Sequence, residues 1–150
     1  LTVTDRRKNI LENLKSRFGN AGIKKYKLMI ADLEKPTVAI DESFDIIIAD
    51  VPCTGSGTWT RTPEQLHFFK QNEIEKYVSL QRKIIENALP QLKNNGRLLY
   101  ITCSVFKNEN EENVIFFREK YELDLLKKEY LKGYEMQADT LFVALFKKNR

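Results

Sequence analysis

The stretch Phe44-Asp45-Ile46-Ile47-Ile48-Ala49-Asp50 is the part of the sequence that decides the fold. Its apolar residues follow one another almost without interruption, which is typical of a strand buried on both faces of a parallel sheet. The run ends on an aspartate, and the next residues, 51–61, contain Pro52, Gly55 and Gly57 and read as an irregular loop. We therefore predict a buried strand over residues 44–49 with a loop at its carboxyl end.

Strand and helix patterns alternate on both sides of this strand. Further strands are predicted over residues 1–4, 26–31, 97–102, 121–129 and 140–147. Helices are predicted over residues 6–18, 72–96 and 109–120. Pro90 is expected to tighten the last turn of the middle helix and Gly96 to end it. This alternation predicts an open α/β sheet with helices on both faces.

The composition is that of one globular domain. A chain of 150 residues has the usual length of one domain, and 42% hydrophobic residues are enough for one core. No apolar run approaches the ~18 residues that a membrane helix needs, so we expect a cytoplasmic protein without a membrane partner. The net charge of +4 comes from scattered lysines and arginines, which permits nucleic-acid binding without arguing for it.

The two cysteines, Cys53 and Cys103, read as thiols. Together with a single histidine they do not supply the four Cys/His ligands of a structural zinc site, so we expect no metal. A tyrosine phosphatase loop is excluded by spacing, because seven residues separate Cys53 from Arg61 and such loops place the arginine nearer. No Gly-Lys-Ser/Thr sequence follows the glycines, so a Walker loop is excluded as well.

Three acids and both thiols follow the ends of predicted strands. Asp5, Asp32 and Asp50 end their strands, and Cys53 and Cys103 come shortly after theirs. Ligands of open α/β sheets bind outside the carboxyl ends of the strands, so we expect all five side chains to meet at one edge. Acids at successive strand ends favour a cofactor with a ribose, although each aspartate alone also fits a helix cap.

A thiol beside a carboxyl group fits attack on an electron-poor ring. Carbon 5 of cytosine accepts a methyl group only after a thiolate has added at carbon 6, while an acid hydrogen-bonded at N3 withdraws charge. Asp50 lies three residues before Cys53, and the second cysteine is available to help release the product. This chemistry alone does not decide which cysteine attacks.

Three sequence motifs carry a resemblance to a known family. They are Asp-Val-Pro-Cys-Thr-Gly-Ser-Gly-Thr-Trp-Thr-Arg-Thr-Pro-Glu over 50–64, Asn-Gly-Arg-Leu-Leu-Tyr-Ile-Thr-Cys-Ser over 95–104, and Glu109-Asn110-Glu111. They closely resemble the RNA cytosine-5 methyltransferases of the Sun/Fmu/nucleolar-protein (NOL/NOP/Sun) family, and the resemblance covers nearly the whole chain. It implies a Rossmann-like sheet, S-adenosylmethionine as cofactor and RNA as substrate, with ribosomal RNA favoured over transfer RNA.

The resemblance also implies the catalytic roles. Cys103 is the expected nucleophile toward carbon 6 of cytosine, because the Thr-Cys-Ser motif surrounds it. Cys53 is expected to assist release of the methylated product. Asp50 is expected to contact the target base and to lie near the methionine end of the cofactor.

The binding roles follow in the same way. The resemblance assigns the cofactor ribose to Asp5 and the adenine amine to Asp32. It assigns contact with the RNA substrate to Pro52 and Arg61.

The sequence departs from the family at its start. The family's first strand and its glycine-rich cofactor loop do not occur in residues 1–150. We therefore expect the chain to be the C-terminal portion of one methyltransferase catalytic domain, inactive alone and binding the cofactor poorly or not at all. The strands that end at Asp5 and Asp50 would have unpaired edges, through which the chain is expected to self-associate.

Two other functions stay open at this stage. One is a non-catalytic RNA-binding relic of the same fold, against which the intact Asp50, Cys53 and Cys103 argue. The other is a methyltransferase that acts on transfer RNA or on a substrate other than RNA, such as a small molecule or a protein.

Overall fold

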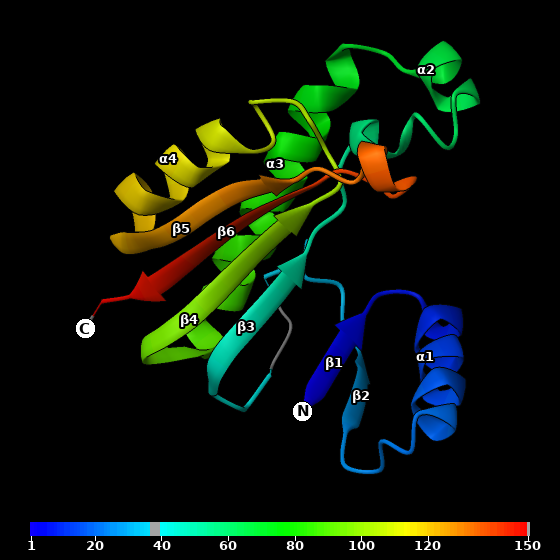
Figure 1. Cartoon of the computed structure of the whole chain (residues 1–150). Coiled ribbons are helices and arrows are strands. Elements are labelled where there is room, and N and C mark those ends of the chain that lie inside the picture. Colours follow the sequence, from blue (N-terminus) through cyan, green and yellow to red (C-terminus); the bar gives the residue numbers. More distant parts are fainter. Residues whose placement is uncertain (37–39, 150) are drawn as a thin grey trace. The chain divides into compact units, whose positions relative to one another are not determined.

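The computed structural model describes residues 1–36 and 40–149 (Figure 1). The chain divides into two compact units, Leu1–Ala39 and Ile40–Arg150. Within the described parts, no helix is both long enough and apolar enough to cross a membrane.

The first unit consists of two parallel strands and the helix that connects them. These are β1 (Thr2–Asp5), α1 (Lys8–Asn20) and β2 (Lys27–Ile30). The strands pair in parallel with Asp5 opposite Ile30, and α1 contacts both of them. Leu11 of α1 is buried, and the rings of Phe18 and Tyr26 meet edge to face. Both strands therefore end at the same edge of this small sheet.

The second unit contains a four-stranded sheet in the order β3-β4-β6-β5. Its strands are β3 (Phe44–Asp50), β4 (Leu92–Thr102), β5 (Leu123–Leu131) and β6 (Leu141–Lys148). Its helices are α2 (Glu64–Phe68), α3 (Asn72–Ala88) and α4 (Glu111–Tyr121), with 3-10 turns η1 (Ser56–Thr58), η2 (Leu89–Gln91) and η3 (Tyr134–Met136). β3 and β4 run parallel, whereas β6 is antiparallel to both β4 and β5.

The core of this unit lies between the sheet and the helices α3 and α4 (Figure 1). Alternate residues of β4 and β6 face it, because side chains of a strand alternate between its two faces. Tyr100 and Phe146 from these strands are fully buried, as are Ile85 of α3 and Phe117 of α4. Burial of each such side chain contributes about 1.5–3 kcal/mol, so β4 is firmly held up to the residue where it ends.

The prediction that residues 44–49 are buried on both faces is wrong. Ile47 and Ala49 pack against the core, but Ile46 and Ile48 are 59% and 66% exposed. The physical reason is that β3 is an edge strand of the sheet described over residues 40–149, and α3 and α4 share a single core on one face. Self-association through this apolar edge stays a prediction.

The prediction that Gly96 ends the middle helix is also wrong. α3 ends at Ala88, and Pro90 lies in the 3-10 turn that follows, which is the tightening expected of it. Gly96 is a buried residue of β4 that follows Asn95, whose φ is 62°, and a Cβ atom at Gly96 would press on the side chain of Leu92. The Asn-Gly pair therefore marks an irregularity within a strand, beside a shift in the β3–β4 register.

Candidate active site

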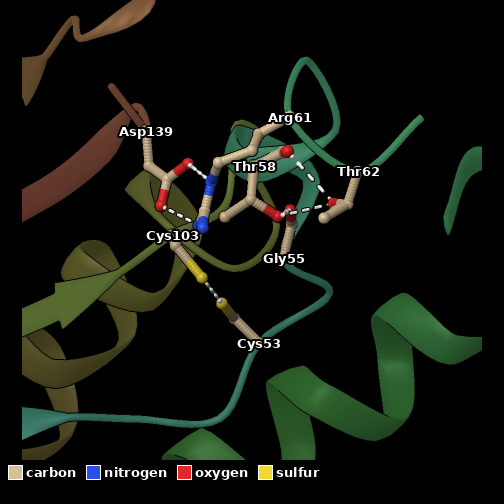
Figure 2. Close-up of polar contacts among 7 residues, drawn as sticks. All are labelled: Cys53, Gly55, Thr58, Arg61, Thr62, Cys103 and Asp139. Carbon is tan, nitrogen blue, oxygen red and sulfur yellow. Dashed lines mark hydrogen bonds and ion pairs between the residues drawn. The ribbon is translucent and has the colours of Figure 1, made fainter. Parts of the chain in front are cut away.

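Two cysteines meet at the carboxyl ends of β3 and β4. Cys103 directly follows β4, and Cys53 lies three residues beyond the end of β3. The parallel pairing places Asp50 opposite Ile101, so the segments that follow both strands begin at the same edge. Figure 2 shows the two side chains pointing toward each other, with 3.2 Å between the Sγ atoms. Both are free thiols, and the structure brings them within hydrogen-bond distance.

The two thiols have unequal surroundings. The hydrogen bond between them lowers the pKa of Cys103, which accepts it as a thiolate, and raises the pKa of Cys53, which donates it. Burial raises the pKa of Cys53 further, and the proton stays on the more deeply desolvated sulfur. Cys103 is therefore the thiol that ionises more readily, a distinction that the chemistry of the sequence alone left open.

The charges of two aspartates, Asp50 and Asp139, act on Cys103. Asp50 is exposed at the end of β3, yet partial desolvation by the protein raises the pKa of its carboxyl group. The negative charges of Asp50 and Asp139 both act to raise the pKa of Cys103, against the effect of Cys53. Asp50 is thus close to the thiol that ionises and holds its proton to a higher pH than a free aspartate does.

Arg61 forms a bidentate ion pair with Asp139. Its Nε atom donates to Oδ1 at 3.1 Å and its Nη2 atom to Oδ2 at 2.6 Å, across 78 positions of sequence (Figure 2). The Arg61 side chain remains 66% exposed. Its expected contact with RNA stays a prediction. In the structure, its positive charge offsets the negative charge of Asp139, an acid whose charge acts on Cys103.

Gly57 holds the loop after β3 against the ends of β4 and β6. Its N–H donates to the carbonyl of Cys103 at 2.8 Å, and its carbonyl accepts from the N–H of Thr140 at 3.0 Å. A Cβ atom at this position would overlap the carbonyl oxygen of Thr140 and press on that of Cys103. Only glycine therefore permits this approach of three backbone segments.

A buried polar cluster lies behind the thiols. Glu109 is its centre and is fully buried, with hydrogen bonds to Thr54 and Ser104, the residues that follow the two cysteines. Pro52 is exposed, and its carbonyl accepts from Nε2 of the buried Gln81 at 2.9 Å. Sequence reasoning noted Glu109 within a motif but gave it no role, and it missed Asp139, because their partners are distant along the chain.

Asp5 and Asp32 lie together at the edge of the first unit where β1 and β2 end. Asp5 accepts from the backbone N–H of Arg7 at 2.7 Å and from its Nε at 3.1 Å, and this hydrogen bond to the guanidinium holds the pKa of Asp5 below its usual value. Asp32 accepts from the N–H of Glu34 at 3.2 Å and forms an ion pair with Lys35 at 3.7 Å. The first residue before α1 is Arg7, without a side-chain cap, so Asp5 does not have the helix-cap role.

The five expected residues therefore form two groups. Cys53, Cys103 and Asp50 belong to the second unit, and Asp5 and Asp32 belong to the first. The meeting of both groups at one edge stays a prediction. In residues 1–36 and 40–149, no three His, Cys, Asp or Glu side chains are grouped so that they could hold a metal ion.

The chain is similar to known RNA methyltransferases over almost its full length. The sequence profile of the family described as 16S rRNA methyltransferase RsmB/F matches residues 1–146. The ribosomal RNA small subunit methyltransferase F of Shewanella loihica (strain ATCC BAA-1088 / PV-4) is 40% identical over 80 residues, which are 53% of this chain and 16% of that protein. The chain thus spans only a small part of the length of this relative.

Two solved structures have the same fold. PH0851 is 32% identical with a TM-score of 0.89, and the match covers 98% of this chain and 36% of that one. NSun6 from Pyrococcus horikoshii, solved with SFG, is 26% identical with a TM-score of 0.87, covering 99% of this chain and 41% of that one. The expected Rossmann-like methyltransferase fold is thereby confirmed.

Proposed function

This chain belongs to the 16S rRNA methyltransferase RsmB/F family, and on that premise we propose that it carries the reacting cysteines of an RNA cytosine-5 methyltransferase. The observation that supports this most directly is the 3.2 Å approach of Cys53 and Cys103, of which Cys103 ionises more readily. Ribosomal RNA is the proposed substrate, since the family and the Shewanella relative are both named for it. Such a substrate would be met in the cytoplasm.

The first step that we propose is addition of a thiol to the ring. The Cys103 thiolate gives its electron pair to carbon 6 of cytosine, and the C5=C6 π electrons move through the ring toward N3. Asp50, whose pKa is raised by desolvation, donates its proton or a hydrogen bond at N3 and so stabilises the developing charge. Carbon 5 becomes nucleophilic as a result.

The last step is release of Cys103. Carbon 5 loses its proton to water, the C5=C6 bond re-forms, and the electron pair of the S–C6 bond returns to the Cys103 sulfur. A proton that N3 received from Asp50 returns to that carboxylate in the same step. The Cys53 S–H group, 3.2 Å away, then donates to the departing thiolate and stabilises it. This gives Cys53 a role in release that needs no covalent bond of its own.

We propose S-adenosylmethionine as the methyl donor. The acceptors present fit it, since Asp5 and Asp32 place two carboxylates at the ends of adjacent parallel strands, where acceptors for ribose hydroxyls and an adenine amine are needed. When bound, the cofactor supplies an electrophilic methyl group. The carboxylates of Asp5 and Asp32 would bind and orient its nucleoside, and the NSun6 structure with SFG is a further reason to expect a ligand on this fold.

A tritium-transfer assay tests the proposed function. The intact protein should transfer label from S-adenosylmethionine to cytosines of unmodified ribosomal RNA. Cys103→Ala should abolish transfer, whereas Cys53→Ala should bind RNA covalently and release it slowly, seen as a slower-migrating adduct on a denaturing gel. Normal turnover of the Cys53 variant would show that the release role is wrong. Label found only in transfer RNA would show that ribosomal RNA is not the substrate.

A further inference from the structure

One buried carboxylate connects the two segments that carry the thiols. Glu109, 0% exposed, accepts four hydrogen bonds. At Oε1 it accepts from the Thr54 N–H at 2.9 Å and from Gln81 Nε2 at 2.9 Å, and at Oε2 from the Thr54 hydroxyl at 2.6 Å and from the Ser104 hydroxyl. An ionised carboxylate has acceptors only, so a site made of four donors matches it fully.

The donors are the immediate neighbours of the thiols. Thr54 follows Cys53 on the segment after β3, and Ser104 follows Cys103 on the segment after β4. The hydroxyls of Thr54 and Ser104 also lie 3.3 Å apart. Glu109 thus connects both segments through residues one position from each sulfur.

A second set of contacts keeps Glu109 itself in place. Gln81 donates to Glu109 and to the Pro52 carbonyl, and its own Oε1 accepts from Asn113 at 2.7 Å. The Tyr100 hydroxyl donates to the backbone carbonyl of Glu109 at 2.6 Å. These partners come from α3, β4 and α4, so the rigid core of the second unit sets the position of the carboxylate.

We infer that Glu109 is the positioning residue that holds the two thiols in unequal roles, with Cys103 as the reactive thiol and Cys53 as its hydrogen-bonding partner. The inference deepens the proposed function and rests on it for its catalytic consequence. The negative charge of Glu109 acts in the same direction, because it is one of the causes that raise the pKa of Cys53.

The test measures the reactivity of each thiol in the intact protein, without RNA or cofactor. Iodoacetamide labelling followed by mass spectrometry of the two cysteine peptides gives a rate for each, and Cys103 should react about tenfold faster or more in the unmodified sequence. Glu109→Ala should bring the two rates to within about threefold, because the segments lose their common partner.

A conservative variant and a matched control separate positioning from general damage. Glu109→Gln keeps the shape, and the hydroxyls of Thr54 and Ser104 can turn to accept from the new amide, so the rate ratio should stay within about threefold of the original. Glu112→Ala removes an exposed carboxylate three positions away that accepts from Asn108 at 3.1 Å, and the ratio should not change. A folded Glu109→Ala protein that keeps the original ratio overturns the inference.

Two variants that each remove one hydroxyl donor to Glu109 serve if Glu109→Ala does not fold. Thr54→Val removes the donor on the Cys53 side, and Ser104→Ala removes the donor on the Cys103 side. The contact between these two hydroxyls is lost in both variants. Each should lower the rate ratio by about two- to tenfold, in line with the loss of one charge-assisted hydrogen bond. If both proteins fold and neither alters the ratio, the inference is wrong.

Methyl transfer measured on the same proteins distinguishes this inference from the proposed function. Glu109→Ala should lower kcat by about 100-fold with little change in KM, because misplacement by about an ångström acts on the reacting atoms. If the labelling ratio responds as expected but the unmodified sequence transfers no methyl group, the proposed function fails and the positioning role stands. If the unmodified sequence transfers methyl groups and a folded Glu109→Ala protein keeps both the labelling ratio and kcat, the positioning role is wrong and the proposed function stands.

Discussion

The thiol edge of the second unit and the acid edge of the first unit are built in opposite ways. Cys53 and Cys103 are held by contacts between residues about fifty positions apart, through the buried carboxylate of Glu109. Asp5 and Asp32 contact residues two or three positions away, namely Arg7, Glu34 and Lys35, on an accessible surface.

This difference indicates that the thiol edge is rigid, whereas the acid edge can exchange its partners. Buried and fully satisfied polar groups are costly to rearrange, so the thiol edge is fixed before a substrate arrives. Exposed ion pairs between near neighbours contribute little to stability and exchange readily, so the acids can give up their partners for a ligand. Changes at the thiol edge should therefore affect chemistry and folding, and changes at the acid edge should affect binding.

Among the changes that leave both cysteines in place, Asp50→Asn should have the largest effect. The amide cannot transfer a proton to the ring, so methyl transfer should fall by about 100-fold or more. Because desolvation raises the pKa of Asp50, its protonated form persists to a higher pH than usual and declines as the pH rises. In the unmodified sequence, kcat should therefore decrease as the pH rises and Asp50 loses its proton. The pH profile of kcat for Asp50→Asn should lack this decrease. An unchanged profile would remove Asp50 from the mechanism.

A methyl group at Gly57 should break the thiol edge. Gly57→Ala forces the loop away from the carbonyls of Thr140 and Cys103, and it should lower the free energy of unfolding by about 1–3 kcal/mol. Gly19→Ala is the control, since no atom lies within 4 Å of the added Cβ and the residue lies in α1. That variant should be neutral or more stable by about 0.5–1 kcal/mol. Denaturant titrations of both proteins compare the two units directly.

Asp5→Asn should separate binding from stability at the acid edge. Loss of a charged acceptor for the ribose should weaken cofactor binding about tenfold, whereas the free energy of unfolding should change by less than about 1 kcal/mol. The Arg7 contact lowers the pKa of Asp5, so its small contribution is present at neutral pH and is lost as the pH falls through that lowered pKa. Calorimetry with the cofactor and pH-dependent unfolding measure the two effects. A large loss of stability would contradict the comparison.

The smallest expected effect is that of Arg61→Ala without RNA. Asp139 would lose its partner, its charge would oppose ionisation of Cys103 more strongly, and alkylation of Cys103 should slow by about two- to fivefold. The difference should shrink in about 1 M salt, where surface charges are screened. Lys93→Ala removes a comparable exposed ion pair with Asp45 and should leave the rate unchanged. If Arg61→Ala changes RNA binding but not the alkylation rate of Cys103, the proposed effect of Arg61 on Cys103 is wrong and only its expected contact with RNA remains.

Local patterns predicted the elements of the fold well but not their surroundings. The strand ending at Asp50, the helix that begins at residue 72 and the two final strands all occur where the periodicity placed them, within a few residues. The exposure of Ile46 and Ile48 could not be predicted, because an apolar run looks the same in a central strand and in an edge strand. The prediction that Gly96 ends a helix failed for a related reason, since glycine is common both at helix ends and at irregularities within strands.

The sequence by itself determined which residues stand at the strand ends and, through three specific motifs, the family to which the chain belongs. Strand periodicity and motif spacing are properties of residues that are close in the chain, so they can be recognised from the sequence. Only the tertiary structure decided that Cys53 and Cys103 share a hydrogen bond and that Cys103 ionises more readily. It also decided that Glu109 contacts the residue after each cysteine and that the charge of Asp139 acts on Cys103. Those properties arise from burial and from contacts between distant residues, and they exist only once β3 and β4 lie side by side.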